Sequence, residues 1–204
     1  MAKTHKKLPI ACTDSNCTSG LHCFRATKEM VEQKRAGVCR ACGTNLIDWP
    51  RVHQRALNDV ANTFSSLKKE YVRHYFWHLG LGQRAVNHAR RKGKDELRGS
   101  LRHHLETAIG PAQPFRDGYQ TPMPAPEDAT TLFPYAQHAT ATCCRTCLEY
   151  WHGIPKGRAL SDDELRYCTE LACLYIEDRI PALTKEGEAI PSLRRNSATD
   201  SAYQ

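Results

Sequence analysis

The 204-residue sequence contains no long hydrophobic run and no recognisable export signal. No stretch approaches the roughly 18 consecutive apolar residues of a membrane span. The basic start, MAKTHKKLPIACTDSNC, has no apolar segment behind it, as a secretory signal would require. These absences argue against membrane insertion, and we expect a cytoplasmic protein with no membrane partner.

Cysteine, in contrast, is abundant and clustered. Of the ten cysteines, five lie between residues 12 and 42, three between 143 and 147, and two at 168 and 173. Because the cytoplasm keeps thiols reduced, disulfides do not explain them, and the clustering favours metal sites. Cys168 and Cys173 lie about 140° apart on a predicted helix, so one ion does not reach both. We expect Cys168 to pack as a small hydrophobic side chain and leave both residues out of the site.

The net charge of +7 is unevenly distributed. Residues 1–106 carry 20 Lys and Arg against 9 Asp and Glu, whereas residues 107–204 carry 9 against 13. A basic first half suggests an anionic partner, most simply nucleic acid, because each phosphate contact releases counterions. The alternative is a solvated basic surface, which charge alone does not exclude.

The chain is expected to fold as a mainly α protein in three parts. Residues 1–50 form a small cysteine-rich module, residues 51–182 a helical domain, and residues 183–204 a polar, disordered tail. Residues 110–136 contain six prolines and are predicted to be mostly loop, with a turn at Asp117-Gly118. A loop this long inside a compact domain often carries function.

The helices of the second part are predicted from apolar spacing and end signals. Apolar residues recur at helical spacing over residues 52–79, as one helix or as two that break near residues 63–66. Gly93 is expected to end a short basic helix, and a further helix follows it. Ser161 and Glu164 form a capping box for a last helix.

The spacing Cys39-Arg-Ala-Cys42-Gly is typical of a tight turn that presents two thiolates to one tetrahedral ion. The other two ligands must come from upstream, where the candidates are Cys12, Cys17, His22 and Cys23. Unligated thiols would leave a fifty-residue module with almost no core. We therefore expect a structural zinc ion in a zinc-ribbon-like module. Its expected ligands are four of the five residues Cys12, Cys17, Cys23, Cys39 and Cys42.

Cys144 and Cys147 have the same chelating spacing. His138 lies six residues before this pair and His152 five after it, which makes a Cys₂His₂ site the simplest closed set. Cys143 can replace Cys144 only with a different local turn. If this segment is helical, His152 points about 140° away from Cys147, so either the helix ends early or His152 is not a ligand.

Three interpretations of this central cluster compete. Closed sets of two cysteines and two histidines are usually structural zinc sites, and this is the favoured interpretation. A catalytic zinc ion using three of the residues comes next, together with an iron–sulfur centre, which we rank below zinc. The third is a set of packed thiols without metal.

Two enzymatic hypotheses can be compared with the motif itself. Zinc deaminases need His-x-Glu followed by Pro-Cys-x-x-Cys, and here Thr142 and Cys143 precede the cysteine pair, so that motif is absent. Cys143 is alternatively a nucleophilic thiol whose pKa the neighbouring Arg145 helps to lower.

The segment RHYFWHLGLGQRAVNHARRKGK, residues 73–94, mixes cations with aromatic residues. This combination suits backbone phosphates and stacking on unpaired bases, although an ordinary amphipathic helix gives the same pattern. His74 and His78 share a helix face, but no Glu between them completes a metalloprotease motif. The candidate nucleic-acid-binding residues are Arg73, Arg84, Arg90, Arg91, Lys92 and Lys94.

Three segments carry a resemblance: RDGYQTPM at 116–123, AQHATATCCRTCLEYWHGIPKG at 136–157 and LSDDELRY at 160–167. Through them residues 70–182 resemble an uncharacterised bacterial family of small domains with the signature QHATATCCRxCLxxWHGIPKG. The family has no established activity, so the resemblance implies little chemistry, and the first fifty residues look like an added zinc module. The resemblance implies one compact unit made by His138, Cys143, Cys144, Cys147, Trp151 and His152.

Taken together, these patterns predict a zinc protein with two sites that binds nucleic acid, in repair, processing or defence. The alternative is a metal- or thiol-dependent enzyme, such as a hydrolase or nuclease acting on nucleic acid. An open coordination position would distinguish a catalytic from a structural zinc site. A third possibility is a protein-interaction module whose fold is stabilised by structural zinc ions. The candidate reacting residues are His138, Cys143 and Glu149, with Asp117 in reserve.

Overall fold

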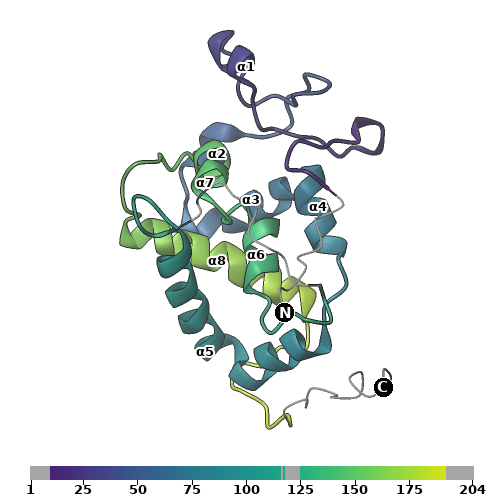
Figure 1. Ribbon diagram of the computed structural model, residues 1–204, viewed down its shortest axis with the longest axis vertical. Coiled ribbons are helices and arrows are strands. Elements are labelled where there is room, and N and C mark those ends of the chain that lie inside the picture. Colours follow the sequence, from purple (N-terminus) through teal and green to yellow (C-terminus); the bar gives the residue numbers. More distant parts are fainter. Residues whose placement is uncertain (1–9, 116, 118–124, 192–204) are drawn as a thin grey trace, which may run out of the picture.

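The computed structural model describes residues 10–115, 117 and 125–191 (Figure 1). Within these residues the chain forms helices and two isolated β-bridges but no strand, which confirms the expected mainly α fold. None of the described helices has the length and apolar composition that crossing a bilayer demands. The helices are the 3₁₀ helices η1 (Cys17–Ser19) and η2 (Leu57–Asp59), and α1 (Lys28–Glu32), α2 (Trp49–His53), α3 (Val60–Leu67), α4 (Tyr71–His78), α5 (Gln83–Ile109), α6 (Phe133–Ala139), α7 (Arg145–His152) and α8 (Asp162–Arg179).

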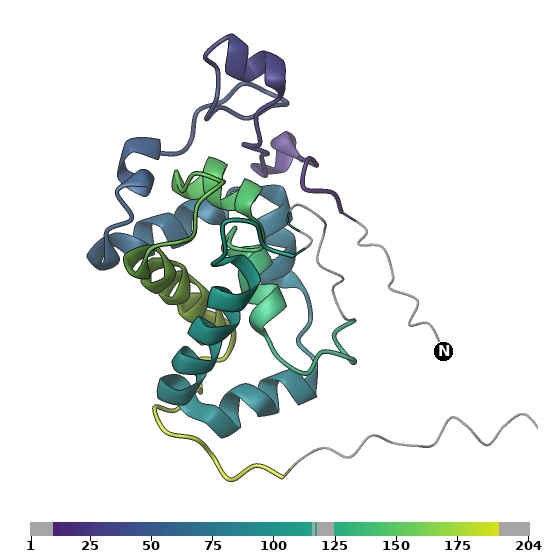
Figure 2. The same cartoon turned by 60° about the vertical axis from the view of Figure 1, so that its left-hand side comes forward.

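Helix α8 is the central element of the helical part, because α3, α5 and α6 all contact it. Helix α4 packs on α6, and α2 packs on α7. The expected capping box is present, with the Ser161 side chain bonded to the Glu164 backbone and the Glu164 side chain bonded back to Ser161. The N-terminal module, residues 10–47, projects from this helical body in both views (Figures 1 and 2).

The predicted helix over residues 52–79 is divided at two places, and neither of them lies at residues 63–66. Helix α2 ends at His53, before η2, and a second break at residues 68–70 separates α3 from α4. Its cause is a long-range contact: Glu70 has extended backbone angles and forms a bridge with His22 of the N-terminal module. The sequence around the break does not contain this information.

Helix α5 bends at Gly93, where the sequence predicts a helix end. Gly93 has φ 65° and ψ 176°, a conformation open essentially to glycine alone. Beyond the bend, α5 lies against α8, and its cations face the acids of α8. This row of ion pairs joins Lys94 to Glu177, Arg98 to Glu170 and Arg102 to Asp162. The excess positive charge of the first half of the chain is therefore partly neutralised within the fold.

The first part of the expected tail is ordered against this bend. The backbone N–H of Lys94 donates to Thr184 O at 3.0 Å, and Arg90 forms two hydrogen bonds with the Glu188 carboxylate. Residues 184–188, assigned to the tail from residue 183 onward, therefore belong to the folded part. The rest of the predicted tail, from residue 192, and Gly118 of the predicted turn lie outside the described residues.

Candidate metal centres

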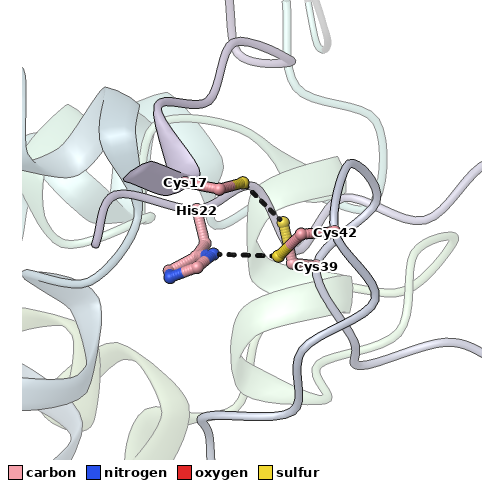
Figure 3. Close-up of side chains that lie close together, drawn as sticks. All are labelled: Cys17, His22, Cys39 and Cys42. Atoms are coloured by element: carbon pink, nitrogen blue, oxygen red, sulfur yellow. Dashed lines mark hydrogen bonds between the residues drawn. The ribbon is translucent and has the colours of Figure 1, made fainter. Parts of the chain in front are cut away.

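Four ligand atoms of the N-terminal module lie within 4.8 Å of one another, from Cys17, His22, Cys39 and Cys42 (Figure 3). The Cys17 and Cys39 sulfurs are 3.7 Å apart, and the Cys42 sulfur lies 3.5 Å from His22 Nδ1. A tetrahedral zinc ion, with bonds of about 2.3 Å to sulfur and about 2.0 Å to nitrogen, requires a sulfur–sulfur edge of about 3.8 Å and a sulfur–nitrogen edge of about 3.5 Å. The four residues therefore fit a closed tetrahedral site.

Two local turns assemble this site. The bridge between Asn16 and Leu21 folds the chain back, so that Cys17 and His22 face each other across η1. On the other side, the Gly43 N–H donates to Cys39 O at 2.8 Å, which closes the turn between Cys39 and Cys42.

Cys12 and Cys23, two of the five predicted cysteine ligands, lie outside this group. The Cys23 thiol is fully buried and donates to the Cys12 carbonyl at 3.6 Å. His22 takes the fourth place. The sequence offers His22 as a candidate but favours a set made of cysteines alone. A long-range backbone contact, described below, fixes its position.

The backbone around Cys39 favours the ionised form of its thiol. Burial acts to raise the pKa of Cys39. Backbone N–H groups of Cys23, Cys42 and Ala41 donate to its sulfur and lower the pKa by more than burial raises it, so that the net value is about 6. A thiolate at neutral pH is the form that binds a metal. The backbone hydrogen bonds therefore hold one candidate ligand, Cys39, in the thiolate form that binds a metal ion.

The second group consists of Cys143, Cys144 and Cys147, whose sulfurs all lie within 4.8 Å of one another. Cys144 caps the N-terminus of α7, and its sulfur accepts the Cys147 N–H at 3.5 Å. The Cys143 and Cys147 sulfurs are 3.6 Å apart, again close to a tetrahedral edge. Sulfurs this close fit a single ion better than a [4Fe–4S] cluster, in which each cysteine binds a different iron.

His138 and His152, the predicted partners of this pair, do not belong to the group. Helix α7 continues through His152 and ends at Gly153, so His152 points away from the sulfurs. Its Nδ1 lies 3.1 Å from Tyr167 OH and its Nε2 lies 3.0 Å from Thr140 O. The sequence leaves two alternatives open: either the helix ends early, or His152 is not a ligand of the cysteine pair. The helix does not end early, so the second alternative applies and the Cys₂His₂ set is not brought together.

His138 is buried against Phe76, with ring centroids 4.7 Å apart. Neither ring nitrogen has a hydrogen-bond partner among the described residues. Burial, and then the charge of Arg73, lowers the pKa of His138 to about 3. Burial is also the main cause that lowers the pKa of His152 to about 3. Both imidazoles are therefore neutral at physiological pH.

The cation beside the central thiols is Arg73, not Arg145 as the sequence suggested. Arg73 is fully buried, and its Nη2 donates to the Cys147 sulfur at 3.2 Å. Arg145 instead donates to three backbone carbonyls, those of Ile109, Pro155 and Arg158. A guanidinium against a sulfur favours the thiolate form that a metal needs.

The pKa of Cys147 results from opposed contributions. The hydrogen bond with Cys143 lowers it, whereas the hydrogen bond with Cys144 and burial raise it, and the net result is a rise to about 12. The protons held by these neighbouring thiols must leave when a cation binds, so metal binding at this group releases protons.

Glu70 completes the surroundings of the central group, and sequence reasoning missed it. Its buried carboxylate accepts hydrogen bonds from Arg73 Nε at 2.9 Å and from Trp151 Nε1 at 2.5 Å. The Tyr150 hydroxyl and the Phe24 backbone N–H bond to it as well. The only sequence signal for the role of Glu70 is that an acidic residue lies within a segment whose apolar residues recur at helical spacing.

The remaining candidate reacting residues are placed differently. Glu149 is half-exposed on α7 and pairs with Lys156 at 3.3 Å. Asp117 accepts the Arg145 backbone N–H at 2.8 Å, and so lies at the N-terminus of α7 beside Cys144. Of these two carboxylates, only Asp117 adjoins the cysteine group.

Most of the predicted nucleic-acid-binding cations are engaged inside the fold. Arg73 is buried, and Arg90, Lys92 and Lys94 pair with Glu188, Glu96 and Glu177. Within the part of the chain that the structure describes, Arg84 and Arg91 form no ion pair. The residues from 73 to 94 therefore do not form one continuous row of free cations.

Fold and sites together define a helical protein with two cysteine-rich groups that can hold metal ions. Residues 61–177, more than half of the chain, match the family described as "Domain of unknown function (DUF4186)", and the chain belongs to that family. The matched region contains the three-cysteine group, whereas the four-ligand group lies outside it. No solved structure matches the chain.

Proposed function

We propose that the protein is a zinc protein whose two sites have different roles. The site of Cys17, His22, Cys39 and Cys42 is closed and structural, and its tetrahedral edges carry this proposal. Zinc accounts for both the mixed sulfur and nitrogen set and the mononuclear spacing. The sites need reduced thiols, which suits a cytoplasmic protein.

The central site is proposed to be the functional one, because it supplies only three ligands among the described residues. The segment at 118–124, GYQTPMP, which follows Asp117, contains no His, Cys, Asp or Glu. Three protein ligands and a free fourth position are typical of catalytic zinc, which lowers the pKa of a bound water or polarises a substrate. This favours a zinc-dependent enzyme, and we propose that the motif at 137–157 is the functional signature of the family.

The number of bound zinc ions tests the proposal. Wild-type protein is expected to carry two, and Cys42→Ser and Cys144→Ser one each, because each variant removes a ligand from one site. Cys12→Ser is the matched control and should keep two, since Cys12 lies outside both groups. With cobalt in place of zinc, added imidazole should change the visible spectrum through the central site only. Two ions in Cys144→Ser would contradict a central metal site, and a spectrum insensitive to imidazole would contradict its open position.

A second candidate function, binding of nucleic acid, is supported by the N-terminal module. Residues 1–47 carry eight Lys and Arg against three Asp and Glu. In contrast to most of those of α5, the described cations of this module form no ion pair, and two of them, Lys34 and Arg35, are exposed on the projecting part. Free cations on a protruding module suit phosphate contacts.

Charge reversal distinguishes this module from the segment that the sequence pointed to. Lys34→Glu/Arg35→Glu is expected to weaken binding of single-stranded or duplex oligonucleotides and to reduce the salt dependence by about one unit per residue. The matched variant Arg84→Glu/Arg91→Glu changes the net charge equally and should bind like the wild type. Fluorescence anisotropy at several salt concentrations measures both. The candidate fails if the first variant binds as well as the second.

A further inference from the structure

The two metal centres are joined by a short path whose two charged side chains, Glu70 and Arg73, are fully buried. Its first step is the β-bridge between His22, a ligand of the first site, and Glu70. The His22 N–H donates to Lys69 O at 2.9 Å, and the Tyr71 N–H donates to His22 O at 2.8 Å. The backbone of a metal ligand therefore holds both neighbours of Glu70.

The second step runs from Glu70 to the central site. Arg73 donates from Nε to the Glu70 carboxylate at 2.9 Å and from Nη2 to the Cys147 sulfur at 3.2 Å. The Tyr150 hydroxyl accepts from Arg73 Nη2 at 2.9 Å and lies 3.1 Å from both Glu70 oxygens. Both charged side chains are 0% exposed, so water does not replace a lost partner at this pair.

An aromatic cluster closes the path from solvent and also spans the two parts of the chain. Phe24, two residues after His22, packs edge-on against Trp151 with centroids 5.9 Å apart. Trp49 packs against both rings. Since the Phe24 N–H donates to Glu70 and the Phe24 ring packs on Trp151, displacement of the N-terminal module would remove one hydrogen bond of Glu70 and part of its apolar surroundings together.

We propose that Glu70 and Arg73 are positioning residues that couple the two metal sites, so that metal at the first site raises the metal affinity of the second. This inference rests on the proposed zinc sites. A filled first site fixes His22, the bridge then seats Glu70, and Glu70 holds Arg73 against Cys147. Arg73 stabilises the Cys147 thiolate and offsets the negative charge that three thiolates leave on a divalent ion.

The coupling is reciprocal, because any effect of one ligand on the affinity of another acts equally in both directions. Metal at the central site holds Cys147, and through it Arg73 and Glu70, in the arrangement that pairs with His22. Loss of either site should therefore weaken the other by the same factor. Variants on the path between the sites distinguish this route from a general loosening of the fold.

Metal affinities measured on the full chain test this coupling, by competition with a chromophoric chelator and with cobalt spectra to identify each site. Cys42→Ser is expected to weaken zinc binding at the central site by about 5- to 150-fold, the usual range of coupling between sites. Cys144→Ser is expected to weaken the first site by the same factor. Cys12→Ser, which removes a thiol from neither site, should leave both affinities unchanged.

Variants on the path test the residues themselves. Tyr150→Phe removes only the hydroxyl between Arg73 and Glu70, and about 10- to 100-fold weaker binding at the central site is expected, as for other groups that support metal ligands. Arg73→Lys keeps the positive charge but cannot contact Glu70 and the Cys147 sulfur at the same time. Its zinc affinity at the central site should lie between those of Tyr150→Phe and Arg73→Met. Glu149 lies on the exposed side of α7, the helix that carries Tyr150. Glu149→Gln is therefore the control and should leave the zinc affinity of the central site unchanged.

The outcomes are distinct. Equal losses in Cys42→Ser and Cys144→Ser support the coupling. An unchanged central affinity in Cys42→Ser, with helical content preserved, overturns it while two zinc sites remain. Wild-type protein that binds fewer than two ions overturns the proposed function instead. If a single variant unfolds, cobalt titration of the wild type still decides, because positively coupled sites give a binding curve steeper than that of independent sites, whereas uncoupled sites do not.

Discussion

Removal of metal by a chelator at neutral pH is expected to unfold residues 10–47 while α5 and α8 stay folded. The described residues of the module form one five-residue α-helix, one three-residue 3₁₀ helix and no strand, and few of their apolar side chains are buried, so its own core does not hold it together. Zinc contributes about 10–16 kcal/mol in small domains with such ligand sets, and those domains unfold without it. Helices α5 and α8 keep their mutual contact and their row of ion pairs.

Limited proteolysis measures this unfolding directly, because trypsin can cut the module at Lys28, Lys34, Arg35 and Arg40. Zinc-loaded protein should resist cleavage there, and chelator-treated protein should lose the module within minutes while a helical fragment persists. Cys42→Ser should be cut even in zinc, and Cys12→Ser should behave as wild type. Equal protection with and without chelator would show that the four ligands do not hold a structural ion.

Features that depend on neighbours in the chain could be predicted from the sequence. The bend at Gly93 and the cap at Ser161 follow from local backbone chemistry, and the turn from Cys39 to Cys42 follows from spacing. The same holds for the mainly α class, because apolar periodicity records which helix faces become buried. Each of these signals lies within a few residues of the structure that it specifies.

What could not be predicted depends on residues far apart in the chain. His22 joins the group of four candidate ligands because its backbone pairs with residues 69 and 71, a contact that no local spacing encodes. Arg73 looks like a phosphate-binding cation until burial places it against Cys147. The predicted ligand His152 bonds instead to Tyr167, a residue of the following helix.

The charge asymmetry between the two halves of the chain shows the same limit. Net charge describes a whole segment, whereas phosphate binding needs cations that are free at the surface. Helices α5 and α8 bring opposite charges together, and most of the candidate cations pair internally. A basic half is therefore a weaker indication of nucleic-acid binding when the other half is acidic and helical.

Acidification below about pH 6 is expected to destabilise the fold steeply, because two buried histidines are neutral in the native state. The pKa values of His138 and His152 are lowered to about 3, mainly by burial, whereas unfolded histidine has a pKa of about 6.5. Between these values the unfolded chain binds protons that the folded chain does not, so stability falls as pH falls. Each histidine contributes about 1.4 kcal/mol per pH unit, and both together about 2.7.

Replacement of His138 by leucine isolates one of these contributions and also tests its predicted role as a ligand. The unpartnered imidazole lies against Phe76, so the variant should be at least as stable as wild type at pH 7. Between pH 6 and 4, the free energy of unfolding should fall less steeply for the variant than for wild type. The two slopes, measured by urea unfolding, should differ by about 1.4 kcal/mol per pH unit. The difference between the two proteins carries the result, because cysteine ligands also take up protons when metal leaves. Zinc content should remain two ions, whereas loss of one ion would identify His138 as the fourth ligand of the central site and close its open position.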